Sequence, residues 1–330
     1  MAVLLNWTLQ MANHAKLAFF GTDEFSATTL KALIQNGYHI DMVITKPDAP
    51  IGRKRIITAP IVKTIAQSHN IPVLQPQRAV DLLDTLQHRC EAGIVVSYGK
   101  ILPQAVLDLF PLGLINVHAS LLPKYRGASP IEAALLNGDA TTGISLMKLE
   151  AGMDTGPVYI QAEYEIASSE TAATLYPELA AIGADLLVRE LDAILDGSLT
   201  PKTQNEATAT HVGMINKTDG IIDWTKTATE IDRQIRAFVV WPGSKATIAN
   251  TEVTITSASI ISPSVISSEV ERSEQGLSSP VDLSPGRFFK TESVDLAVFC
   301  GEGILQIDTL IPAGKRQMTG REFLTGHSLV

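Results

Sequence analysis

The chain has 330 residues, of which 45% are hydrophobic and 18% are charged, and its formal net charge at pH 7 is −9. This length and composition predict a globular protein with room for two domains, and they exclude a disordered or low-complexity chain. The acidic net charge argues against non-specific binding to nucleic acid, although it is compatible with a local basic surface.

Two cysteines, Cys90 and Cys300, are the only thiols of the chain. They are too few for a disulfide framework or a cysteine-rich metal site, which favours a reducing, cytoplasmic environment. No apolar run has the length that a membrane span needs, and the first residues lack the basic leader of a signal peptide. We expect residues 1–15 to form an N-terminal extension, with either Met1 or Met11 as the start of the protein.

Strand and helix patterns alternate in the first half of the chain. A buried strand is expected at Lys16–Phe20, followed by a helix whose apolar side carries Phe25, Leu30 and Leu33. Further expected elements are a strand at 41–45, a helix with Val62, Ile65 and Ala66 on one side, and short apolar runs at 71–74, 93–97 and 115–118. This alternation predicts a Rossmann-like, doubly wound α/β sheet, in which sites lie at the carboxyl ends of the strands.

The turn after the first expected strand, Gly21-Thr22-Asp23, contains a single glycine. A dinucleotide-binding turn needs the Gly-x-Gly-x-x-Gly pattern, and a nucleoside triphosphate loop needs Gly-x-x-x-x-Gly-Lys. Neither pattern occurs here, so the α/β half is predicted to bind its ligand in another way.

The character of the sequence changes after a long helical stretch that ends near residue 195. A polar, threonine-rich segment follows, so we expect a catalytic domain at 16–204, a linker at 205–215 and a second domain at 216–330. The serine-rich segment 262–285 is typical of a mobile, solvated insertion without a chemical role. One helical segment and several β-branched runs predict a small β-barrel in the second domain, at 229–238, 246–248, 252–255, 296–299 and 304–310.

The strongest chemical signal is a set of three polar side chains, Asn116, His118 and Asp154. Asn116 and His118 end an apolar run that is typical of a strand, on which residues two apart point to the same face. Pro123 then stops the strand, because proline lacks the amide hydrogen that pairing requires. A glycine-rich loop at 150–156 can return Asp154 to the same edge. The sequence thus predicts an amide, an imidazole and a carboxylate at one strand end, and these are groups that acyl transfer needs.

The motifs around these residues resemble the folate-dependent formyltransferases, in Asn116-Val117-His118, Ser120-Leu121-Leu122-Pro123, Tyr125-Arg126-Gly127 and Gly152-Met153-Asp154-Thr155-Gly156. The similarity is closest to the methionyl-tRNA formyltransferase family, and it continues through Phe20-Gly21-Thr22, Lys46-Pro47-Asp48, Gly52–Arg55, Ser97–Pro103, Ile222-Asp223-Trp224, Arg236-Ala237-Phe238, Trp241-Pro242-Gly243 and Pro312–Lys315. This resemblance implies a Rossmann-like formyltransferase domain followed by an OB-like β-barrel that binds tRNA. It also implies transfer of a formyl group from 10-formyltetrahydrofolate to initiator methionyl-tRNA.

The three polar side chains can take the roles that formyl transfer requires. Asn116 can donate an amide hydrogen to the oxygen that becomes negative, and such a donor is worth ~3–4 kcal/mol of barrier. His118 can carry protons between the attacking and the leaving nitrogen, while Asp154 orients its ring. No nucleophilic serine motif is present, so no covalent enzyme intermediate is expected. The other histidines lack the spacing of metal ligands, and no metal site is predicted.

The resemblance also implies where 10-formyltetrahydrofolate binds. Two loops would present backbone groups and apolar side chains to its flat heterocycle. The residues expected to line this pocket are Ser97, Tyr98, Gly99, Ile101, Leu102, Ser120, Leu121, Leu122 and Pro123.

A basic loop that begins at Gly52 is the first of several groups of cations implied to contact tRNA. It reads Arg-Lys-Arg after the glycine, which departs from the Gly-Arg-Gly-Lys pattern of the family. Phosphate contacts at this loop would position the acceptor end without reading sequence. The residues expected to contact tRNA are Arg53, Lys54, Arg55, Lys217, Arg236, Lys245 and Lys315.

Two other functions fit parts of this pattern. A formyltransferase for a small amine, such as an amino sugar nucleotide or glycinamide ribonucleotide, would use the same Asn116, His118 and Asp154. The enzymes for glycinamide ribonucleotide usually lack a second domain, whereas sugar formyltransferases also carry C-terminal extensions. A non-catalytic RNA-binding protein on a formyltransferase scaffold would not need the intact trio. No membrane association and no stable protein partner are predicted.

Overall fold

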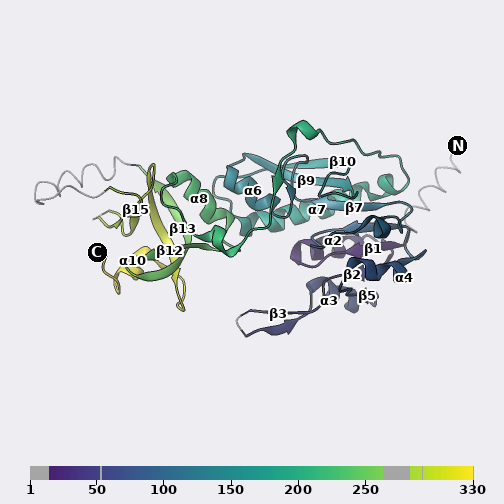
Figure 1. Cartoon of the computed structure of the whole chain (residues 1–330), viewed down its shortest axis with the longest axis horizontal. Helices are drawn as coiled ribbons and strands as arrows, with labels where there is room; N and C mark the ends of the chain where they lie inside the picture. Colours follow the sequence, from purple (N-terminus) through teal and green to yellow (C-terminus); the bar gives the residue numbers. More distant parts are fainter. Residues whose placement is uncertain (1–14, 53, 263–282, 292, 330) are drawn as a thin grey trace, which may run out of the picture. The chain divides into compact units, whose positions relative to one another are not determined.

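The computed structural model of the chain describes residues 15–52, 54–262, 283–291 and 293–329. Arg53, residues 1–14 of the expected N-terminal extension and residues 263–282 of the expected insertion lie outside this described part. The described chain forms two compact units (Figure 1). The first unit contains residues 15–130, 140–166 and 175–213, and the second contains residues 131–139, 167–174 and 214–329.

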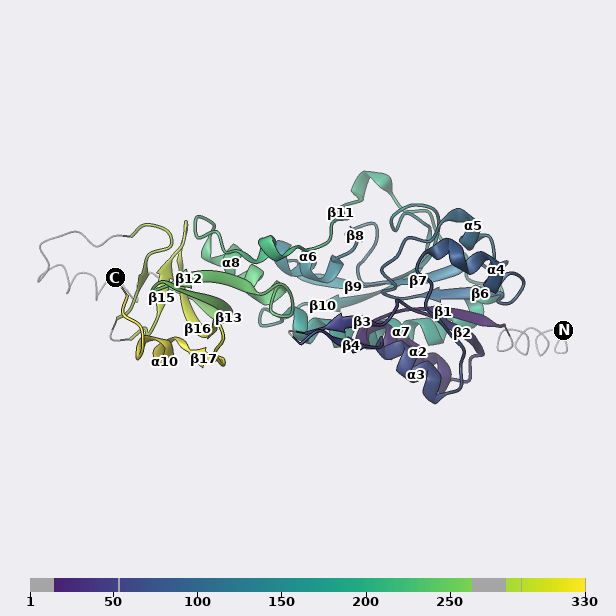
Figure 2. The same ribbon diagram turned by 60° about the horizontal axis from the view of Figure 1, so that its bottom comes forward.

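A seven-stranded sheet forms the centre of the first unit, with the strand order β10-β9-β7-β6-β1-β2-β5 (Figures 1 and 2). The bounds of the strands are β1 Leu17–Phe20, β2 Ile40–Ile44, β5 Val73–Leu74, β6 Ala92–Val95, β7 Leu114–His118, β9 Thr141–Lys148 and β10 Val158–Glu165. Strands β5, β2, β1, β6 and β7 run parallel, and β9 and β10 form an antiparallel edge. The predicted Rossmann-like sheet is confirmed, and the antiparallel edge is an addition that the sequence analysis did not predict.

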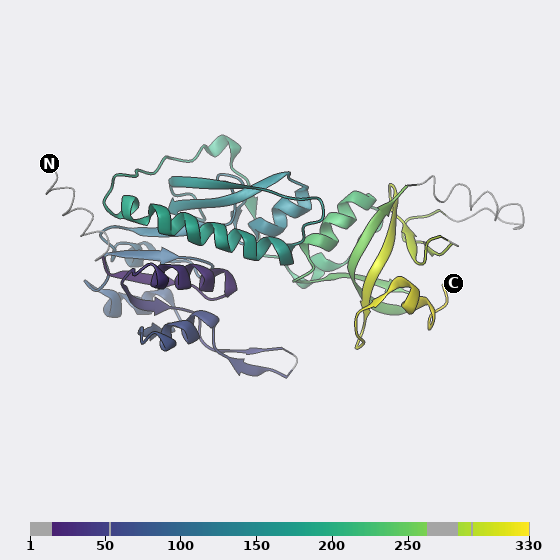
Figure 3. The same cartoon turned by 180° about the vertical axis from the view of Figure 1, so that it is seen from behind.

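Helices cover both faces of this sheet. They are α2 Glu24–Gln35, α3 Ile61–Ser68, η1 Ala79–Leu82, α4 Leu83–Leu86, α5 Gln104–Leu107 and α7 Ala172–Leu195; the short helix η2 Glu206–Thr208 lies in the segment that follows α7. Figures 2 and 3 show α2 and α7 on one face and α4 and α5 on the other. Phe25 of α2 and Tyr176 of α7 meet edge to face, which joins these two helices over the sheet.

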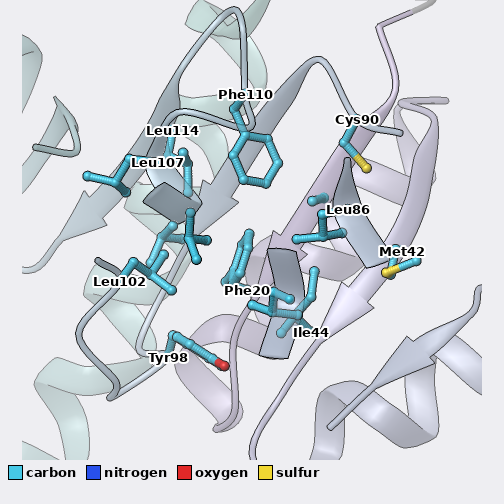
Figure 4. Close-up of a cluster of buried hydrophobic side chains, with 14 residues drawn as sticks. Phe20, Met42, Ile44, Leu86, Cys90, Tyr98, Leu102, Leu107, Phe110 and Leu114 are labelled. Atoms are coloured by element: carbon cyan, nitrogen blue, oxygen red, sulfur yellow. The ribbon is translucent and has the colours of Figure 1, made fainter. Parts of the chain in front are cut away.

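The residues of β1 alternate between the two faces of the sheet. Phe20 points into a cluster of buried side chains that includes Leu86, Tyr98 and Phe110 (Figure 4). Burying a side chain of this size stabilises the fold by about 1.5–3 kcal/mol. The cluster therefore holds the strands and the chain that follows β6 in fixed positions, which the site at the strand ends requires.

The apolar faces expected for the first two helices are buried, as predicted. Phe25, Leu30 and Leu33 point inward from α2, and Val62 and Ile65 point inward from α3. Among the described helices, none combines the length and the apolar character that crossing a membrane requires.

Two short ribbons complete the first unit. β3 (Ala49–Ile51) and β4 (Ile56–Thr58) form an antiparallel hairpin, where the sequence predicted a basic loop between a strand and a helix. β8 (Arg126–Gly127) pairs in parallel with β11 (His211–Val212), as Figure 2 shows. The chain at 205–212, expected as the start of a linker, is therefore hydrogen-bonded to the segment that follows β7.

The second unit is built on a curled antiparallel sheet with the order β12-β13-β16-β15-β14 and with β17 beside β16 (Figure 3). Its elements are α6 Pro130–Asn137, η3 Lys217–Gly220, α8 Ala228–Ala237, β12 Ser244–Ile248, β13 Thr251–Ile261, β14 Phe288–Phe289, β15 Ala297–Phe299, β16 Ile304–Pro312, β17 Met318–Thr319 and α10 Gly320–Leu324. The register of β13 shifts around Ser257, and such irregularities bend a strand and help a sheet to curl. α8 buries Ile231 and Ile235 in the core of this unit. The predicted OB-like second domain is confirmed.

Candidate active site

The carboxyl ends of β6 and β7 lie side by side in the sheet. Val95, the last residue of β6, pairs with Asn116, and His118, the last residue of β7, pairs with Ser145 of β9. Asn116 and His118 are two positions apart on one strand, so they project to the same face. Both side chains are buried.

The loop after β9 brings Asp154 to these two side chains. One carboxylate oxygen, Oδ1, lies 3.4 Å from Asn116 Nδ2, and the other, Oδ2, lies 3.6 Å from His118 Nδ1. The structure thus brings the amide, the imidazole and the carboxylate together at the end of β7.

The imidazole of His118 has a defined hydrogen-bonding arrangement. Its Nε2 atom lies 3.0 Å from the backbone oxygen of Tyr125. A carbonyl oxygen only accepts hydrogen bonds, so Nε2 must carry the hydrogen and donate it. In the neutral ring the lone pair is then on Nδ1, the nitrogen that faces Asp154. Nδ1 is therefore the ring nitrogen that has a lone pair available to accept a proton.

The backbone of Asp154 adopts an uncommon conformation that its neighbours hold in place. Its φ is +53°, in the left-handed region that residues other than glycine rarely occupy. The backbone nitrogen of Gly127 donates to Oδ2 of Asp154 at 2.8 Å. Gln204 Nε2 donates to the backbone oxygens of Asp154 and Gly156, at 2.7 Å each. These contacts offset a conformational cost of about 1–3 kcal/mol.

The segment 120–123, expected to contact the folate, is tied to the antiparallel edge of the sheet. Ser145 Oγ donates to the backbone oxygen of Ser120 at 2.6 Å and accepts from the backbone nitrogen of Leu122 at 3.0 Å. Gln161 Nε2 donates to Ser145 Oγ and to the backbone oxygen of Leu122. The β9 and β10 strands thereby fix the shape of this loop.

The second expected folate loop, 96–103, leaves the sheet beside the end of β7. It forms no helix or strand, so its backbone groups are not committed to regular structure. Gly99 has a φ of +67°, and the side chain of Ile101 is 83% exposed. Tyr98 and Leu102 instead point into the core cluster, so they can reach a ligand only through their backbone groups. A loop outside regular secondary structure that carries an exposed apolar side chain suits a flat, partly apolar heterocycle.

The expected tRNA contacts include exposed cations in both units. Lys54 and Arg55 lie in the turn of the β3–β4 hairpin and are exposed, whereas Arg53 lies outside the described residues. In the second unit, the exposed cations of the predicted set are Lys217, Lys245 and Lys315.

Arg236 differs from these cations. Its side chain is 18% exposed, and Nε forms an ion pair with Asp232 at 2.9 Å. One guanidinium nitrogen also donates to the backbone oxygen of Glu170 at 3.0 Å. The guanidinium of Arg236 is therefore paired with groups of the second unit. We assign this residue to the structure of that unit and not to RNA contact.

Two of the remaining histidines have local structural partners. His39 lies 3.8 Å from Asp41, and His327 stacks on Phe323. Within the part of the chain that the structure describes, no three His, Cys, Asp or Glu side chains are placed to hold a metal ion.

Sequence reasoning did not single out several residues that support the site. Gln204, Glu206 and Thr210 lie in a polar segment that was interpreted as the end of one domain and a linker. Arg126 was visible only as part of a family motif, although its side chain is 1% exposed. A buried arginine needs a buried or bidentate partner, but its partner Glu206 is far away in the sequence.

Comparisons with known proteins agree with this architecture. The family described as "Formyl transferase" matches residues 15–191, and the family described as "Formyl transferase, C-terminal domain" matches residues 214–328. Among solved structures, an N-formyltransferase from Helicobacter canadensis, in complex with folinic acid and dTDP-3-aminofucose, has a TM-score of 0.63 at 20% identity and covers 89% of this chain and 99% of its own. HypX from Aquifex aeolicus, in complex with tetrahydrofolic acid, has a TM-score of 0.61 at 14% identity and covers 94% of this chain and 47% of its own. At these identities, the likeness concerns the fold.

Closer relatives are found in sequence. A methionyl-tRNA formyltransferase from Nitrosomonas eutropha is 39% identical over 319 residues, which cover 95% of each chain. A methionyl-tRNA formyltransferase from Myxococcus xanthus is 39% identical over 317 residues, which cover 95% of this chain and 96% of that protein. With both family matches and this identity over nearly the whole length, the chain belongs to the formyl transferase family, together with these methionyl-tRNA formyltransferases.

Proposed function

We propose that this protein transfers the formyl group of 10-formyltetrahydrofolate to the free amino group of initiator methionyl-tRNA. The observation that carries the proposal is the convergence of Asn116, His118 and Asp154, in a chain that is 39% identical to methionyl-tRNA formyltransferases over nearly its whole length. The folate supplies the formyl group when bound, and the side chains of the protein handle the protons and the developing charge. The product is the formylmethionyl-tRNA that begins translation.

His118 carries the proton in this mechanism. The attacking amino group is neutral, and it becomes positively charged as its nitrogen forms a bond to the formyl carbon. Nδ1 of His118 accepts a proton from it, because Nε2 is already donating to the oxygen of Tyr125. The proton then passes to the folate nitrogen as the bond between that nitrogen and the formyl carbon breaks. General acid–base steps of this kind contribute roughly 10²–10⁴-fold to the rate.

Asn116 stabilises the formyl oxygen as it becomes negative. One of its amide hydrogens is directed to Asp154 Oδ1, which leaves the other for the oxygen of the substrate. Asp154 orients both partners, since Oδ1 faces Asn116 and Oδ2 faces His118. Burial of the two side chains excludes water and so strengthens these electrostatic contacts.

The tRNA is bound in this proposal through local cations. The net charge of −9 means that phosphate contacts must come from such groups rather than from the overall charge. We assign these contacts to Arg53, Lys54, Arg55, Lys217, Lys245 and Lys315. The reaction is placed in the cytoplasm, and no stable protein partner is required for it.

A transfer assay with labelled 10-formyltetrahydrofolate tests the proposal. The acceptors are charged initiator tRNA, charged elongator tRNA, uncharged initiator tRNA and an amino sugar nucleotide. We expect label only on charged initiator tRNA. Label on the amino sugar nucleotide alone would establish the small-amine alternative, and binding of tRNA without transfer to any acceptor would establish the non-catalytic one.

A further inference from the structure

We infer that Gln204 is a positioning residue for the proposed catalytic Asp154. It belongs to a segment, residues 204–212, that we call the supporting segment. This inference rests on the proposed function, because the role of Asp154 in formyl transfer is part of that proposal.

The side-chain amide of Gln204 is buried, and both its nitrogen and its oxygen form hydrogen bonds. Nε2 donates to the backbone oxygens of Asp154 and Gly156, at 2.7 Å each. Oε1 accepts a hydrogen bond from Arg126 Nε at 3.0 Å. Gln204 therefore holds the loop on both sides of residue 155 and ties it to a second element.

Arg126 determines which way the amide of Gln204 faces. Its guanidinium donates to the two carboxylate oxygens of Glu206, at 2.9 Å and 2.6 Å. These hydrogen bonds raise the pKa of Arg126, whose guanidinium is charged in proteins in any case. A charged donor beside Oε1 favours the orientation in which the amide nitrogen of Gln204 faces Asp154. The two amide hydrogens of Gln204 then point at the backbone oxygens of Asp154 and Gly156.

The supporting segment continues along the chain that follows β7. The backbone nitrogen of Thr210 donates to the oxygen of Pro123 at 3.1 Å, and its backbone oxygen accepts from the nitrogen of Arg126 at 2.9 Å. Thr210 Oγ1 accepts from the backbone nitrogen of Tyr125 at 2.8 Å. The pairing of β11 with β8 extends this contact to residues 211–212.

These contacts reach two of the three proposed catalytic side chains. The oxygen of Tyr125 accepts from His118, and the nitrogen of Gly127 donates to Asp154. The supporting segment thus holds the imidazole through one backbone group and the carboxylate through another. Gln204 adds the direct restraint on the backbone of Asp154.

The left-handed conformation of Asp154 makes this restraint important for catalysis. Without donors to its backbone oxygen, the loop can relax toward commoner φ values and carry the carboxylate away from His118. A displacement of roughly 1 Å at a reacting group can lower the rate about 10²-fold. Substrate affinity should change little, because Ser145 and Gln161 hold the expected folate loop at 120–123. Within the described residues, none of the exposed cations expected to contact tRNA is hydrogen-bonded to Gln204.

The test uses two variants of the full chain, Gln204→Glu and Gln204→Met. Glutamate keeps the acceptor for Arg126 but places an oxygen where the donor stood, and methionine keeps the length while removing both the donor and the acceptor for Arg126. In both we expect kcat for methionyl-tRNA formylation to fall about 10–100-fold, with KM for folate and tRNA within about 2-fold of the original. Hydrogen exchange of the Gly127 amide, which donates to Asp154 Oδ2, should become faster.

Tyr38→Phe is the matched control in the same unit. The single hydroxyl hydrogen of Tyr38 is within reach of the backbone oxygen of Val188, at 3.2 Å, and of Asp192 Oδ1, at 3.1 Å, so the control also loses a tertiary hydrogen bond. We expect it to lower Tm to a similar extent but to leave kcat and the exchange of the Gly127 amide unchanged.

The outcomes separate this inference from the proposed function. If the unmodified protein formylates methionyl-tRNA and both folded Gln204 variants match its kcat and its exchange of the Gly127 amide, the positioning role is wrong. If Tyr38→Phe lowers kcat as much as the Gln204 variants do, the loss reflects a general loss of stability and the positioning role is also wrong. If the unmodified protein transfers no formyl group, the proposed function is wrong and the catalytic importance of Gln204 is rejected with it.

Discussion

The segment 116–128 and the hairpin at 49–58 belong to the same unit, but they are held in opposite ways. Along 116–128, side-chain and backbone groups bond to β9, to the loop at Asp154 and to the supporting segment. The strands of the hairpin pair with each other, and Ile56 and Ile57 remain more than half exposed. One region is restrained from several sides, and the other projects basic and apolar side chains into solvent.

The difference follows from what each region is proposed to do. Proton transfer and oxyanion stabilisation depend on distances that must hold within a fraction of an ångström. Contacts to a nucleic-acid backbone depend mainly on charge, and exposed side chains can adapt to it. Substitutions should therefore lower turnover in the first region and weaken tRNA binding in the second.

The largest effect is expected for His118→Ala. Without the imidazole, the proton of the attacking amine has no acceptor, so kcat should fall roughly 10²–10⁴-fold while KM for tRNA changes little. Single-turnover formylation with saturating folate measures this directly. Turnover near that of the unmodified protein would remove His118 from the mechanism and with it the contrast between the two regions.

Asn116→Ala should follow, with a loss of roughly 10²–10³-fold in kcat, because one donor to the formyl oxygen is removed. The measurement is the same single-turnover rate, and Asn137→Ala is a control that loses an asparagine hydrogen bond within a helix of the second unit. A rise in the KM for folate with kcat unchanged would show that Asn116 binds the folate and does not stabilise the developing charge.

A smaller effect is expected in the hairpin. Arg55→Gln should raise KM for methionyl-tRNA a few-fold and reduce the slope of log affinity against log salt by about 0.9, with kcat and KM for folate unchanged. Lys31→Gln, which removes an exposed charge from α2, is the matched control and should leave the slope as it is. If Arg55→Gln and Lys31→Gln behave alike, the hairpin is a surface turn without a role in tRNA binding.

The smallest effect is expected for Glu206, the exposed partner of the buried Arg126. Hydrogen bonds from Arg126 lower the pKa of Glu206 below its ordinary value of 4.5. A lowered pKa means that the stabilisation is present above this ordinary value and is lost as the pH falls through the lower, folded-state value. Glu206→Gln should therefore lower Tm slightly at pH 7, and the difference should vanish in acid. Because the carboxylate is 72% exposed, a large change at pH 7 would contradict this account.

Local patterns predicted the parallel part of the fold and the convergence of the three polar residues. The strand that ends at His118 and the glycine-rich loop around Asp154 are each encoded by residues that are close together in the chain, so the sequence alone predicts both. The antiparallel edge was missed although β10 alternates exposed and partly buried residues, as a strand with one covered face does.

The supporting segment could not be predicted in the same way. Its residues are polar, and polarity in a segment between two domains favours a linker. What gives these residues a structural role is contact with distant partners, since Gln204 bonds to Asp154 and Arg126, which lie 50 and 78 positions away. Such pairings depend on the completed sheet, so no local pattern carries them.

The pairing of β8 with β11 also constrains how a chain of this design can change during evolution. An insertion between Gln204 and Val212 would displace residues whose hydrogen bonds hold the active site. The polar composition of this segment nevertheless resembles that of a flexible linker, in which insertions are usually tolerated. Past Gly213 the chain enters the second unit, and a change of length there leaves these bonds intact. A recombination event that exchanges residues 214–329 for a part with another acceptor preference would therefore have to join the two genes after Val212. The new part would also have to pack against residues 131–139 and 167–174 of the second unit, which come from before the junction.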